Sequence, residues 1–366
     1  MTNTVNAPYT TPSYAVNSKD DKFKLWACPR RVPRSEDVRI AIEYCGICHS
    51  DLHQVRNEWQ NAMYPMVPGH EIVGRVVQLG EDAQKKGKFK VGDVVGVGCF
   101  VDSCRSCDAC KRGLEIQFCP QVVMTYNARG KDGEPTYGGY AREVVVAYPY
   151  VLRIPDALAK PEMLPRAAPL LCAGITTFSP LRYAGVKKGS RVAVIGLGGL
   201  GHMAVRLAKA MGCEVSLFSR SESKRKDALE LLKADRYVVS SDAEAMKAEA
   251  GRYDLVVDTV SAKHDVQQLL ALLAPEGKLC MLGIPPVPLE IPANALVFGR
   301  KSIFGSLVGG IKETQEMLDF CGKHGVSCEV EMITPDQIDE AYKRMDRSDV
   351  KYRFVIDVNK MPESCA

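Results

Sequence analysis

The chain has 366 residues, of which 46% are hydrophobic and 25% charged, and its formal net charge is +4. This length is greater than one ordinary hydrophobic core supports, so it predicts two domains. The sequence has no run of Lys and Arg, which excludes a typical nucleic-acid partner. No stretch approaches the roughly 20 apolar residues of a membrane span, and the polar residues 1–20 lack the apolar segment of a secretory signal, so we expect a cytoplasmic protein without a membrane partner.

The first half of the chain predicts a loop-rich domain that is mostly β. Residues 37–44 and 71–79 are rich in β-branched side chains and alternate roughly in polarity, which is typical of strands. Gly, Pro and Asp punctuate the sequence between and after them, and indicate turns. Within residues 1–20 we expect only a short first strand.

From about residue 190, predicted strands alternate with predicted helices. The strands are 191–196, 214–219, 237–240, 253–260 and 278–283, and the helices between them are 199–212, about 222–233 and about 265–273. Such alternation predicts an α/β domain with a parallel sheet whose faces are covered. The last stretch predicts two helices and a final strand, at about 312–324, about 336–346 and 352–358.

The turn after the first strand of this α/β region has the sequence GLGGLG. It fits G-x-G-x-x-G, and it leaves a strand and opens a helix, which is the context that binds the diphosphate of a dinucleotide. The first glycine permits a tight turn, the second a close backbone approach, and the third close packing of helix on sheet. A glycine-rich corner without a ligand is the alternative. The candidate cofactor residues are Gly196, Gly198, Gly199, Leu200 and Gly201.

The end of the next strand indicates which dinucleotide binds. Folds that bind NAD usually place Asp or Glu about 20 residues after the glycines, at the ribose 2′-hydroxyl. Hydroxyls and cations stand here instead, namely Ser219, Arg220, Ser221 and, a little later, Lys224 and Arg225. They suit a 2′-phosphate and predict NADP(H). A solvated basic helix start is the alternative, and Glu222 lies nearby.

Fourteen cysteines in a reducing compartment do not suggest a disulfide framework, and a tight cluster of them suggests metal ligands. Cys104, Cys107 and Cys110 are separated by two residues each, and Cys119 follows after eight. Four thiolates at this spacing can close a tetrahedral zinc site. Because such a site has no open position, we expect it to be structural.

A second group of metal-binding side chains lies upstream, in the segments CGICHSDLH and PGHE. Cys48 and His70 offer a thiolate and an imidazole, whereas a catalytic zinc needs a third protein ligand and one open position. Local spacing does not identify that third ligand. Cys45 and Cys48 also form a CxxC pair, so a redox dithiol is the competing interpretation.

Ordered segments along the chain match one known family. They include GICHSDLH (46–53), YPMVPGHEIVG (64–74), TYGGYA (136–141), PLLCAGITTFSPL (169–181), LFSRSESK (217–224) and VKYRFVIDV (350–358). Through them the chain resembles the zinc-containing medium-chain dehydrogenases and, within these, the cinnamyl alcohol dehydrogenase-like branch. The resemblance extends from about residue 35 to about residue 358.

The resemblance implies two zinc ions per chain, one catalytic and one structural. It implies that Cys172 completes the catalytic site with Cys48 and His70. Glu71 is similar to a family residue that can approach the metal when water or substrate leaves.

The resemblance also implies roles around the metal. Ser50 is similar to the hydroxyl that bonds the substrate oxygen and passes on its proton, and His53 to the outer relay to solvent. Asp51 is similar to the acid that orients the metal-binding imidazole. Thr177 falls in the family's loop against the nicotinamide. The hydroxyls and cations after the second strand fall where the NADP-preferring branch grips the 2′-phosphate.

The implied fold is a GroES-like β-rich catalytic domain and a Rossmann domain with a doubly wound parallel sheet. The catalytic domain comprises residues 1–172, with the structural zinc lobe at 104–119, and a C-terminal return at 310–366; the Rossmann domain comprises 173–309. The active site is expected in the cleft between them. Members of this branch are usually homodimers joined edge to edge through their Rossmann sheets.

Three features depart from the family pattern. The gap between Cys110 and Cys119 is one residue longer than usual, which bears on the shape of the lobe. Met124 replaces a substrate-pocket Trp of plant members that reduce lignin precursors, and Trp59 replaces an aliphatic side chain in a segment that lines the pocket. These two replacements predict a broad aldehyde range instead of a lignin role.

The sequence therefore predicts a zinc-dependent NADP(H) alcohol dehydrogenase, or aldehyde reductase. It would transfer hydride between NADPH and aromatic or medium-chain aliphatic aldehydes, giving primary alcohols. The alternatives are a polyol (mannitol-type) dehydrogenase on the same scaffold, a non-catalytic binding or structural protein, and a zinc-free quinone reductase. The retained ligands and relay residues argue against the last two.

Overall fold

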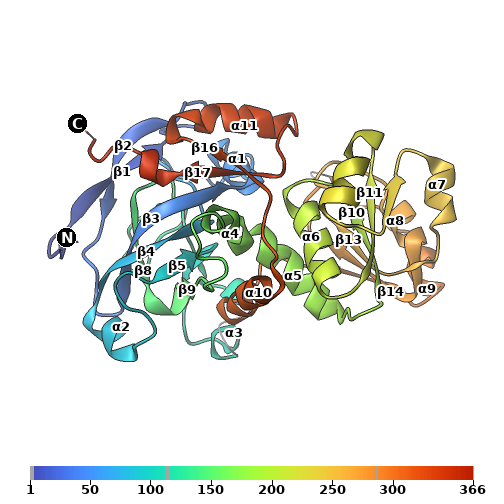
Figure 1. Cartoon of the computed structure of the whole chain (residues 1–366), viewed down its shortest axis with the longest axis horizontal. Coiled ribbons are helices and arrows are strands. Elements are labelled where there is room, and N and C mark those ends of the chain that lie inside the picture. The colour runs from blue at the N-terminus through green and yellow to red at the C-terminus, as the bar shows by residue number, and fades with distance from the viewer. Residues whose placement is uncertain (1–3, 113–115, 286, 366) are drawn as a thin grey trace. The chain divides into compact units, whose positions relative to one another are not determined.

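The computed structural model describes residues 4–112, 116–285 and 287–365. The chain divides into two compact units (Figure 1). Unit 1 contains Met1–Cys172 and Gly309–Ala366, and unit 2 contains Ala173–Val308. Unit 2 is thus an insertion into unit 1, and the chain enters it directly after Cys172.

Unit 1 is built around a seven-stranded, mostly antiparallel sheet in the order β16–β17–β3–β4–β5–β9, with β8 also paired to β3. The central strand β3 (Asp37–Ile47) is long enough to bind two strands along one edge. Its residues 44–47 pair with β17 (Arg353–Asp357), and its residues 37–41 pair with β8 (Glu143–Ala147). The remaining strands are β4 (Ile72–Leu79), β5 (Val94–Val97), β9 (Leu152–Arg153) and β16 (Val330–Ile333).

Two small two-stranded sheets and several helices complete unit 1. β1 (Tyr9–Ala15) pairs with β2 (Lys24–Arg30), and β6 (Phe100–Asp102) pairs with β7 (Val123–Met124). The helices are α1 (His49–Val55), α2 (Glu81–Lys86), α3 (Asp108–Lys111), α4 (Leu164–Ala167), α10 (Ile311–His324) and α11 (Ile338–Asp346). None of the described helices in either unit is long and apolar enough to cross a lipid bilayer.

Unit 2 contains a six-stranded parallel sheet in the order β12–β11–β10–β13–β14–β15. The order reverses between β10 and β13. In open sheets of this kind, dinucleotides bind at such a switch point, beyond the carboxyl ends of the strands. The strands are β10 (Arg191–Ile195), β11 (Glu214–Ser219), β12 (Arg236–Val239), β13 (Tyr253–Asp258), β14 (Leu273–Met281) and β15 (Ser302–Gly305).

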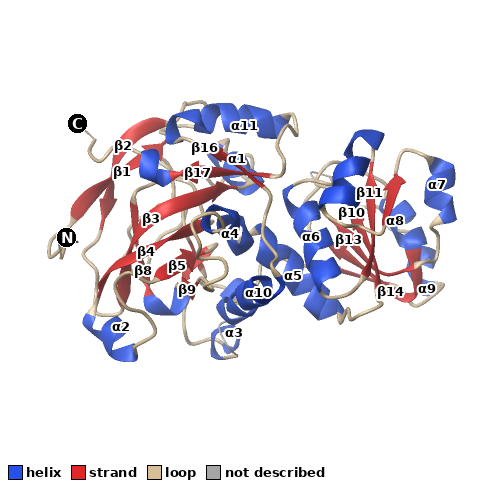
Figure 2. Ribbon diagram, viewed as in Figure 1, coloured by secondary structure: helices blue, strands red, loops and turns tan. Residues whose placement is uncertain are grey.

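Helices cover both faces of this sheet (Figure 2). Helices α5 (Ala173–Ala184) and α6 (Gly199–Ala210) lie on one side of the sheet. Helices α7 (Ala243–Ala248), α8 (Val266–Leu272) and α9 (Asn294–Val297) lie on the other. The inner strands β10, β11 and β13 are therefore mostly buried on both faces, which is why their sequences are nearly continuous apolar runs.

One predicted helix differs from a regular α-helix. Within residues 222–233 the structure has a 3₁₀ turn, Glu222–Lys224, and then a wide π turn, Asp227–Leu231. The N–H of Leu232 donates to the carbonyl of Asp227 at 2.9 Å. Ala228 and Leu232 are 0% and 2% exposed, so the wider turn brings both side chains to the buried side.

Candidate functional site

The segment that leaves β3 turns directly into α1 and positions several candidate site residues. Cys48 is the N-cap of α1, and its backbone N–H donates to Asp51 Oδ2 at 2.9 Å. This hydrogen bond caps the helix and fixes the turn. Ser50 and His53 follow on the same helix, so β3 and α1 together determine where these side chains lie.

Four side chains of unit 1 converge although they come from three segments. One ligand atom each from Cys48, His70, Glu71 and Cys172 lies within 4.8 Å of all the others. The Sγ atoms of Cys48 and Cys172 are 3.8 Å apart. Two sulfurs bound at about 2.3 Å to a tetrahedral zinc are separated by about 3.8 Å. The group therefore fits a zinc ion.

A buried carboxylate orients the imidazole of this group. Asp51 is 0% exposed, and its Oδ1 lies 3.2 Å from Nδ1 of His70. The hydroxyl of Tyr140 and the backbone N–H of Gly69 also donate to Asp51, at 3.2 and 3.3 Å. Because Nδ1 of His70 faces Asp51, Nε2 is the nitrogen available to a metal.

Glu71 is paired with Arg353, which was not among the predicted site residues. Arg353 on β17 donates to Oε1 of Glu71, and both side chains are buried. The guanidinium supplies the opposite charge without which a buried carboxylate is strongly destabilising. Oε2 of Glu71 has no hydrogen-bond partner among the described residues. This oxygen is therefore free to face a metal.

The electrostatics of the group favour a thiolate at Cys48. A hydrogen bond with Cys172 holds the pKa of Cys48 well below its ordinary value against the opposing effect of burial, and Arg353 and His70 act in the same direction. The same hydrogen bond raises the pKa of Cys172. Of the two sulfurs, that of Cys48 therefore favours the thiolate, which is the form that binds a metal. Cys99 is also hydrogen-bonded to Cys172, and it was not among the predicted site residues.

His53 is in contact with solvent, since its side chain is 33% exposed. Its Nδ1 is 2.6 Å from Oε2 of Glu58, and its ring centroid is 5.6 Å from that of Trp59. Ser50 is half-buried. Glu58 was not predicted as a site residue. It lies after the end of α1, and its separation of five residues from His53 is not one that brings two side chains together on a helix.

The two predicted pocket residues are both open to solvent. Trp59 is 44% exposed and Met124 is 41% exposed. Met124 ends β7, and two residues later the ring of Tyr126 stacks on the imidazole of His70 with 5.9 Å between centroids. The strand that carries Met124 thus leads to the metal-binding imidazole.

The second cysteine cluster also converges. The Sγ atoms of Cys104, Cys107, Cys110 and Cys119 lie within 4.8 Å of one another. Backbone N–H groups of Ser106 and Cys107 lower the pKa of Cys104 to about 5, so a thiolate forms readily. The donor set of four thiolates fits a closed zinc site. The longer gap before Cys119 includes residues 113–115, which lie outside the described residues.

In unit 2, the glycine-rich turn lies at the carboxyl end of β10, beside the switch point. Gly196 has φ +93°, a conformation that favours glycine, and a Cβ on Gly201 would lie 2.0 Å from the carbonyl oxygen of Gly196. A Cβ on Gly198 would meet nothing within 4 Å, so the backbone there is open to a ligand. Gly199 and Leu200 open α6, whose first N–H groups have no side-chain cap and can bind a diphosphate.

Cations gather after β11. Lys224 Nζ donates to the carbonyl of Leu197 in the glycine-rich turn at 2.7 Å, which ties the two segments together. Burial, and then the neighbouring Arg220 cation, lower the pKa of Lys224. Two cations this close favour a bound anion. Ser219 and Ser221 flank Arg220 and add hydroxyl donors.

Glu222 does not oppose an anion at this site. Both of its carboxylate oxygens are bonded by the guanidinium of Arg225, three residues later. The nearby acid is thus paired with Arg225, so it does not neutralise the cations of Arg220 and Lys224.

Thr177 lies in α5 and not in a loop, so the expectation of a loop was wrong. Its Oγ1 donates to the carbonyl of Ala173 at 2.7 Å, and its side chain is 0% exposed. This back-bonding satisfies the hydroxyl within its own helix, which is how Thr is accommodated in a helix interior.

Comparison with known proteins gives the same class from both halves of the chain. Residues 34–156 match the alcohol dehydrogenase GroES-like domain, and residues 199–323 match the zinc-binding dehydrogenases. The chain is 53% identical over 350 residues to an NADP-dependent alcohol dehydrogenase C of Mycolicibacterium smegmatis, covering 95% of this chain and 98% of that protein. It is 53% identical over 330 residues to a mannitol dehydrogenase of Petroselinum crispum, covering 90% and 96%.

A solved structure agrees with these relatives. The cinnamyl alcohol dehydrogenase of Sorghum bicolor superposes with a TM-score of 0.92 at 45% identity, covering 98% of this chain and 100% of that one. The chain belongs to the zinc-binding alcohol dehydrogenases. Within that family it belongs to the cinnamyl alcohol dehydrogenase-like branch. The predicted family and the predicted fold class, a GroES-like domain with a Rossmann-type domain, are confirmed.

Proposed function

We propose that the protein is a zinc- and NADPH-dependent aldehyde reductase that also oxidises primary alcohols. The observation that carries this proposal is the convergence of Cys48, His70 and Cys172 in a geometry that fits zinc. A zinc ion held there would supply Lewis acidity toward a carbonyl or alcohol oxygen. The NADP-dependent relative at 53% identity supports the same activity.

Ser50 and His53 carry the proton in this proposal. The Ser50 hydroxyl gives a proton to the product oxygen, and His53 replaces that proton from solvent. Partial exposure of His53 supports contact with water, and its hydrogen bond to Glu58 holds the ring in one orientation. Asp51 positions His70 and takes no part in the proton transfer itself.

The cofactor lies on unit 2 in this proposal. The glycine-rich turn and the first N–H groups of α6 hold the diphosphate. Ser219, Arg220, Ser221 and Lys224 hold the 2′-phosphate, and the pairing of Glu222 with Arg225 supports a preference for NADPH. Thr177 helps to shape the nicotinamide site by packing, since its hydroxyl is already bonded within α5.

The substrate range we propose is broad, covering aromatic and medium-chain aliphatic aldehydes. Trp59 and Met124 present exposed apolar surface on the unit that carries the metal ligands. Such surface favours apolar substrates and offers few hydrogen bonds to a polyol. A mannitol-type dehydrogenase is the second candidate, because a mannitol dehydrogenase is among the relatives at 53% identity.

A spectrophotometric screen tests this proposal. We expect NADP⁺ reduction with benzyl alcohol and hexan-1-ol to exceed NADP⁺ reduction with mannitol by at least about ten-fold in kcat/KM, which is about 1.4 kcal/mol of differential transition-state stabilisation. Prolonged treatment with a chelator should abolish the activity, and added zinc should restore it. Faster turnover of mannitol would favour the second candidate, and full activity after verified metal removal would contradict both.

We also propose two zinc ions per chain and a cytoplasmic location. The Cys104–Cys119 lobe would hold the second, structural ion, since it offers four thiolates and no open position. All fourteen cysteines lie among the described residues, and none forms a disulfide. Unpaired thiols in this number favour a reducing compartment.

We further propose that the enzyme is a homodimer joined through β15. Among the described residues no strand pairs with the outer edge of β15. Large apolar side chains near it are open to solvent, namely Tyr183 at 73%, Ile284 at 68%, Val297 at 71%, Phe298 at 77% and Leu307 at 65%. An unpaired edge beside exposed apolar surface is typical of an interface.

Charge placed on this surface should separate the subunits. We expect Phe298→Glu to convert a dimer into a monomer in light scattering, because burying an unpaired carboxylate costs several kcal/mol. Val91 on unit 1 is 55% exposed, so Val91→Glu is the matched control and should remain dimeric. A Phe298→Glu protein that stays dimeric would place the interface elsewhere.

A further inference from the structure

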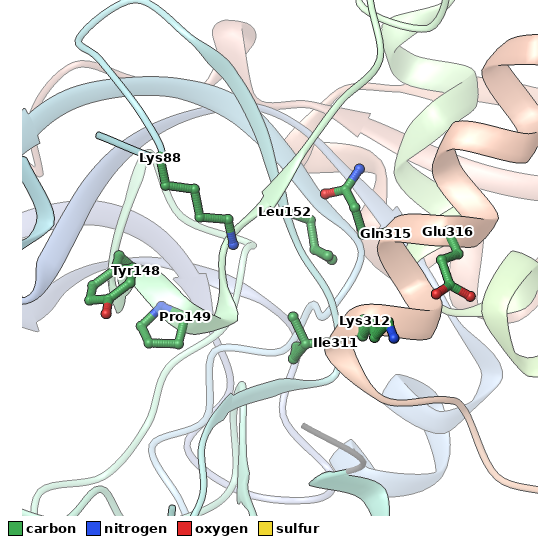
Figure 3. A pocket seen from close by; sticks show the side chains of 8 residues that line it. All are labelled: Lys88, Tyr148, Pro149, Leu152, Ile311, Lys312, Gln315 and Glu316. Atoms are coloured by element: carbon green, nitrogen blue, oxygen red, sulfur yellow. The ribbon is translucent and has the colours of Figure 1, made fainter. Parts of the chain in front are cut away.

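Unit 1 carries a pocket whose lining includes none of the metal-binding side chains (Figure 3). Its volume is about 570 Å³, within the range of small-molecule sites. The strand β9, the turn before it and the first turns of α10 form its walls. It is lined by Lys88, Tyr148, Pro149, Leu152, Ile311, Lys312, Gln315 and Glu316.

The walls of this pocket are mainly apolar around a single partly buried amine. Leu152 and Ile311 are buried side chains that face the pocket, and Pro149 lies beside them. Lys88 reaches across one side, with its amine directed toward the middle of the pocket (Figure 3). Lys312, by contrast, is exposed on the far side.

The surroundings of the Lys88 amine make it unusual among surface lysines. Its Nζ donates to the carbonyl of Val151 at 2.8 Å and lies 4.9 Å from the centroid of the Phe89 ring. The guanidinium of Arg153 lies over the same ring, at 5.8 Å. Burial, and then the charge of Arg153, lower the pKa of Lys88 to about 8.

A lysine that is desolvated beside an apolar wall and next to another cation is an activated nucleophile. With a pKa of about 8 in place of 10.5, about a quarter of the amine is neutral at pH 7.5, against about one part in a thousand for an ordinary lysine. The carbonyl of Val151 accepts a hydrogen bond from the amine of Lys88 and holds the nitrogen in place. The lone pair of the neutral amine is then available to an electrophile in the pocket.

We propose that Lys88 is a reversible covalent capture site for aldehydes, separate from the Cys48–His70–Cys172 group. The amine nitrogen adds to the carbonyl carbon, and the carbonyl oxygen leaves as water with both amine hydrogens. A C=N bond replaces the C=O bond, so the step needs neither oxidant nor reductant. The aldehydes that this enzyme family handles supply the electrophile, and the apolar walls suit an aromatic or aliphatic tail.

Reductive trapping tests this site without turnover. The zinc-loaded full-length protein, without NADPH, is incubated with benzaldehyde and cyanoborohydride at pH 7.5, and the adducts are located by peptide mass spectrometry. We expect Lys88 to be labelled at least ten-fold faster than Lys312, which lines the same pocket and serves as the internal control. Lowering the pH to 6 should slow the labelling of Lys88 by more than ten-fold as its amine becomes protonated.

A variant makes the assignment specific. Lys88→Arg keeps a cation and a donor for the Val151 carbonyl but has no nucleophilic amine at this pH. It should lose the fast adduct while its melting temperature and aldehyde reduction stay at the wild-type level. Labelling of Lys88 at the rate of Lys312, or a fast adduct that survives in Lys88→Arg, would overturn the proposal. Because trapping does not involve hydride transfer, its outcome is independent of the proposed reductase activity.

Discussion

Replacing Cys48 or Cys172 by Ser is expected to lower kcat for aldehyde reduction by about a thousand-fold or more, since Lewis-acid stabilisation contributes several kcal/mol. A serine hydroxyl is a poor zinc ligand, because it is not ionised near neutral pH, whereas the Cys48 thiolate is favoured by its neighbours. NADPH affinity should change by less than about two-fold, since the glycine-rich turn and the cations after β11 belong to unit 2. Metal analysis should find one zinc fewer per chain than in the wild type.

Cys45 provides the matched control. It is a buried cysteine three residues before Cys48, and it is absent from the group of converging ligand atoms. Cys45→Ser should therefore keep its full zinc content and its kcat. The same variant tests the CxxC interpretation, because a redox dithiol would lose its activity with either cysteine. Near-normal turnover in Cys48→Ser would contradict the metal assignment.

Replacing Arg220 by Ala is expected to raise the KM for NADPH by about 10- to 100-fold, because a charge-assisted hydrogen bond to phosphate contributes about 1.5–3 kcal/mol. Activity with NADH should change by less than about two-fold, since NADH lacks the 2′-phosphate. Steady-state kinetics with both cofactors measures the two effects separately.

Arg225 is the matched control for this variant. It lies five residues after Arg220, but its guanidinium is already bonded to Glu222. Arg225→Ala releases that carboxylate and should weaken NADPH binding less than Arg220→Ala does. Equal losses with NADPH and NADH in Arg220→Ala would show that the residue supports the fold and does not select the cofactor.

Five of the six strands of the parallel sheet of unit 2 could be predicted, because they are short apolar runs that alternate with helical patterns. The edge strand β15 was missed, since it has only four residues and none of them is fully buried. One predicted helix of unit 2 also differs from a regular α-helix. The segment after β11 has helical composition, but Ala228 and Leu232 are both buried against the sheet. Burial of both side chains requires a wider turn than a regular α-helix provides. This requirement comes from the tertiary fold, so the local sequence pattern does not predict it.

The antiparallel strands of unit 1 were harder to predict. β9 and β7 have two residues each, which is too short for any periodicity.

Helix α5 of unit 2 was missed because Pro180 lies inside it and its sequence contains two adjacent threonines. The helix accommodates the threonines by burying them and by the hydrogen bond from Thr177 Oγ1 to the carbonyl of Ala173.

The candidate metal ligands were recognised from motifs, but their partners were not. Arg353 lies 282 residues from Glu71, and only the pairing of β17 with β3 brings it near. Tyr140 likewise reaches Asp51 from a distant turn. Sequence motifs report ligands that chemistry requires, whereas the groups that orient or neutralise those ligands depend on the tertiary fold.

The insertion of unit 2 determines the order in which ribosomal synthesis completes the metal site. Cys172 emerges as the last residue before the inserted unit, but Arg353 follows 181 positions later, after the whole of that unit. Until then the nascent chain lacks the guanidinium that neutralises Glu71. The counter-ion of Glu71 is thus supplied only after the whole inserted unit has been synthesised, and a message truncated before β17 would yield a polypeptide whose candidate ligands are all present but whose carboxylate has no counter-ion.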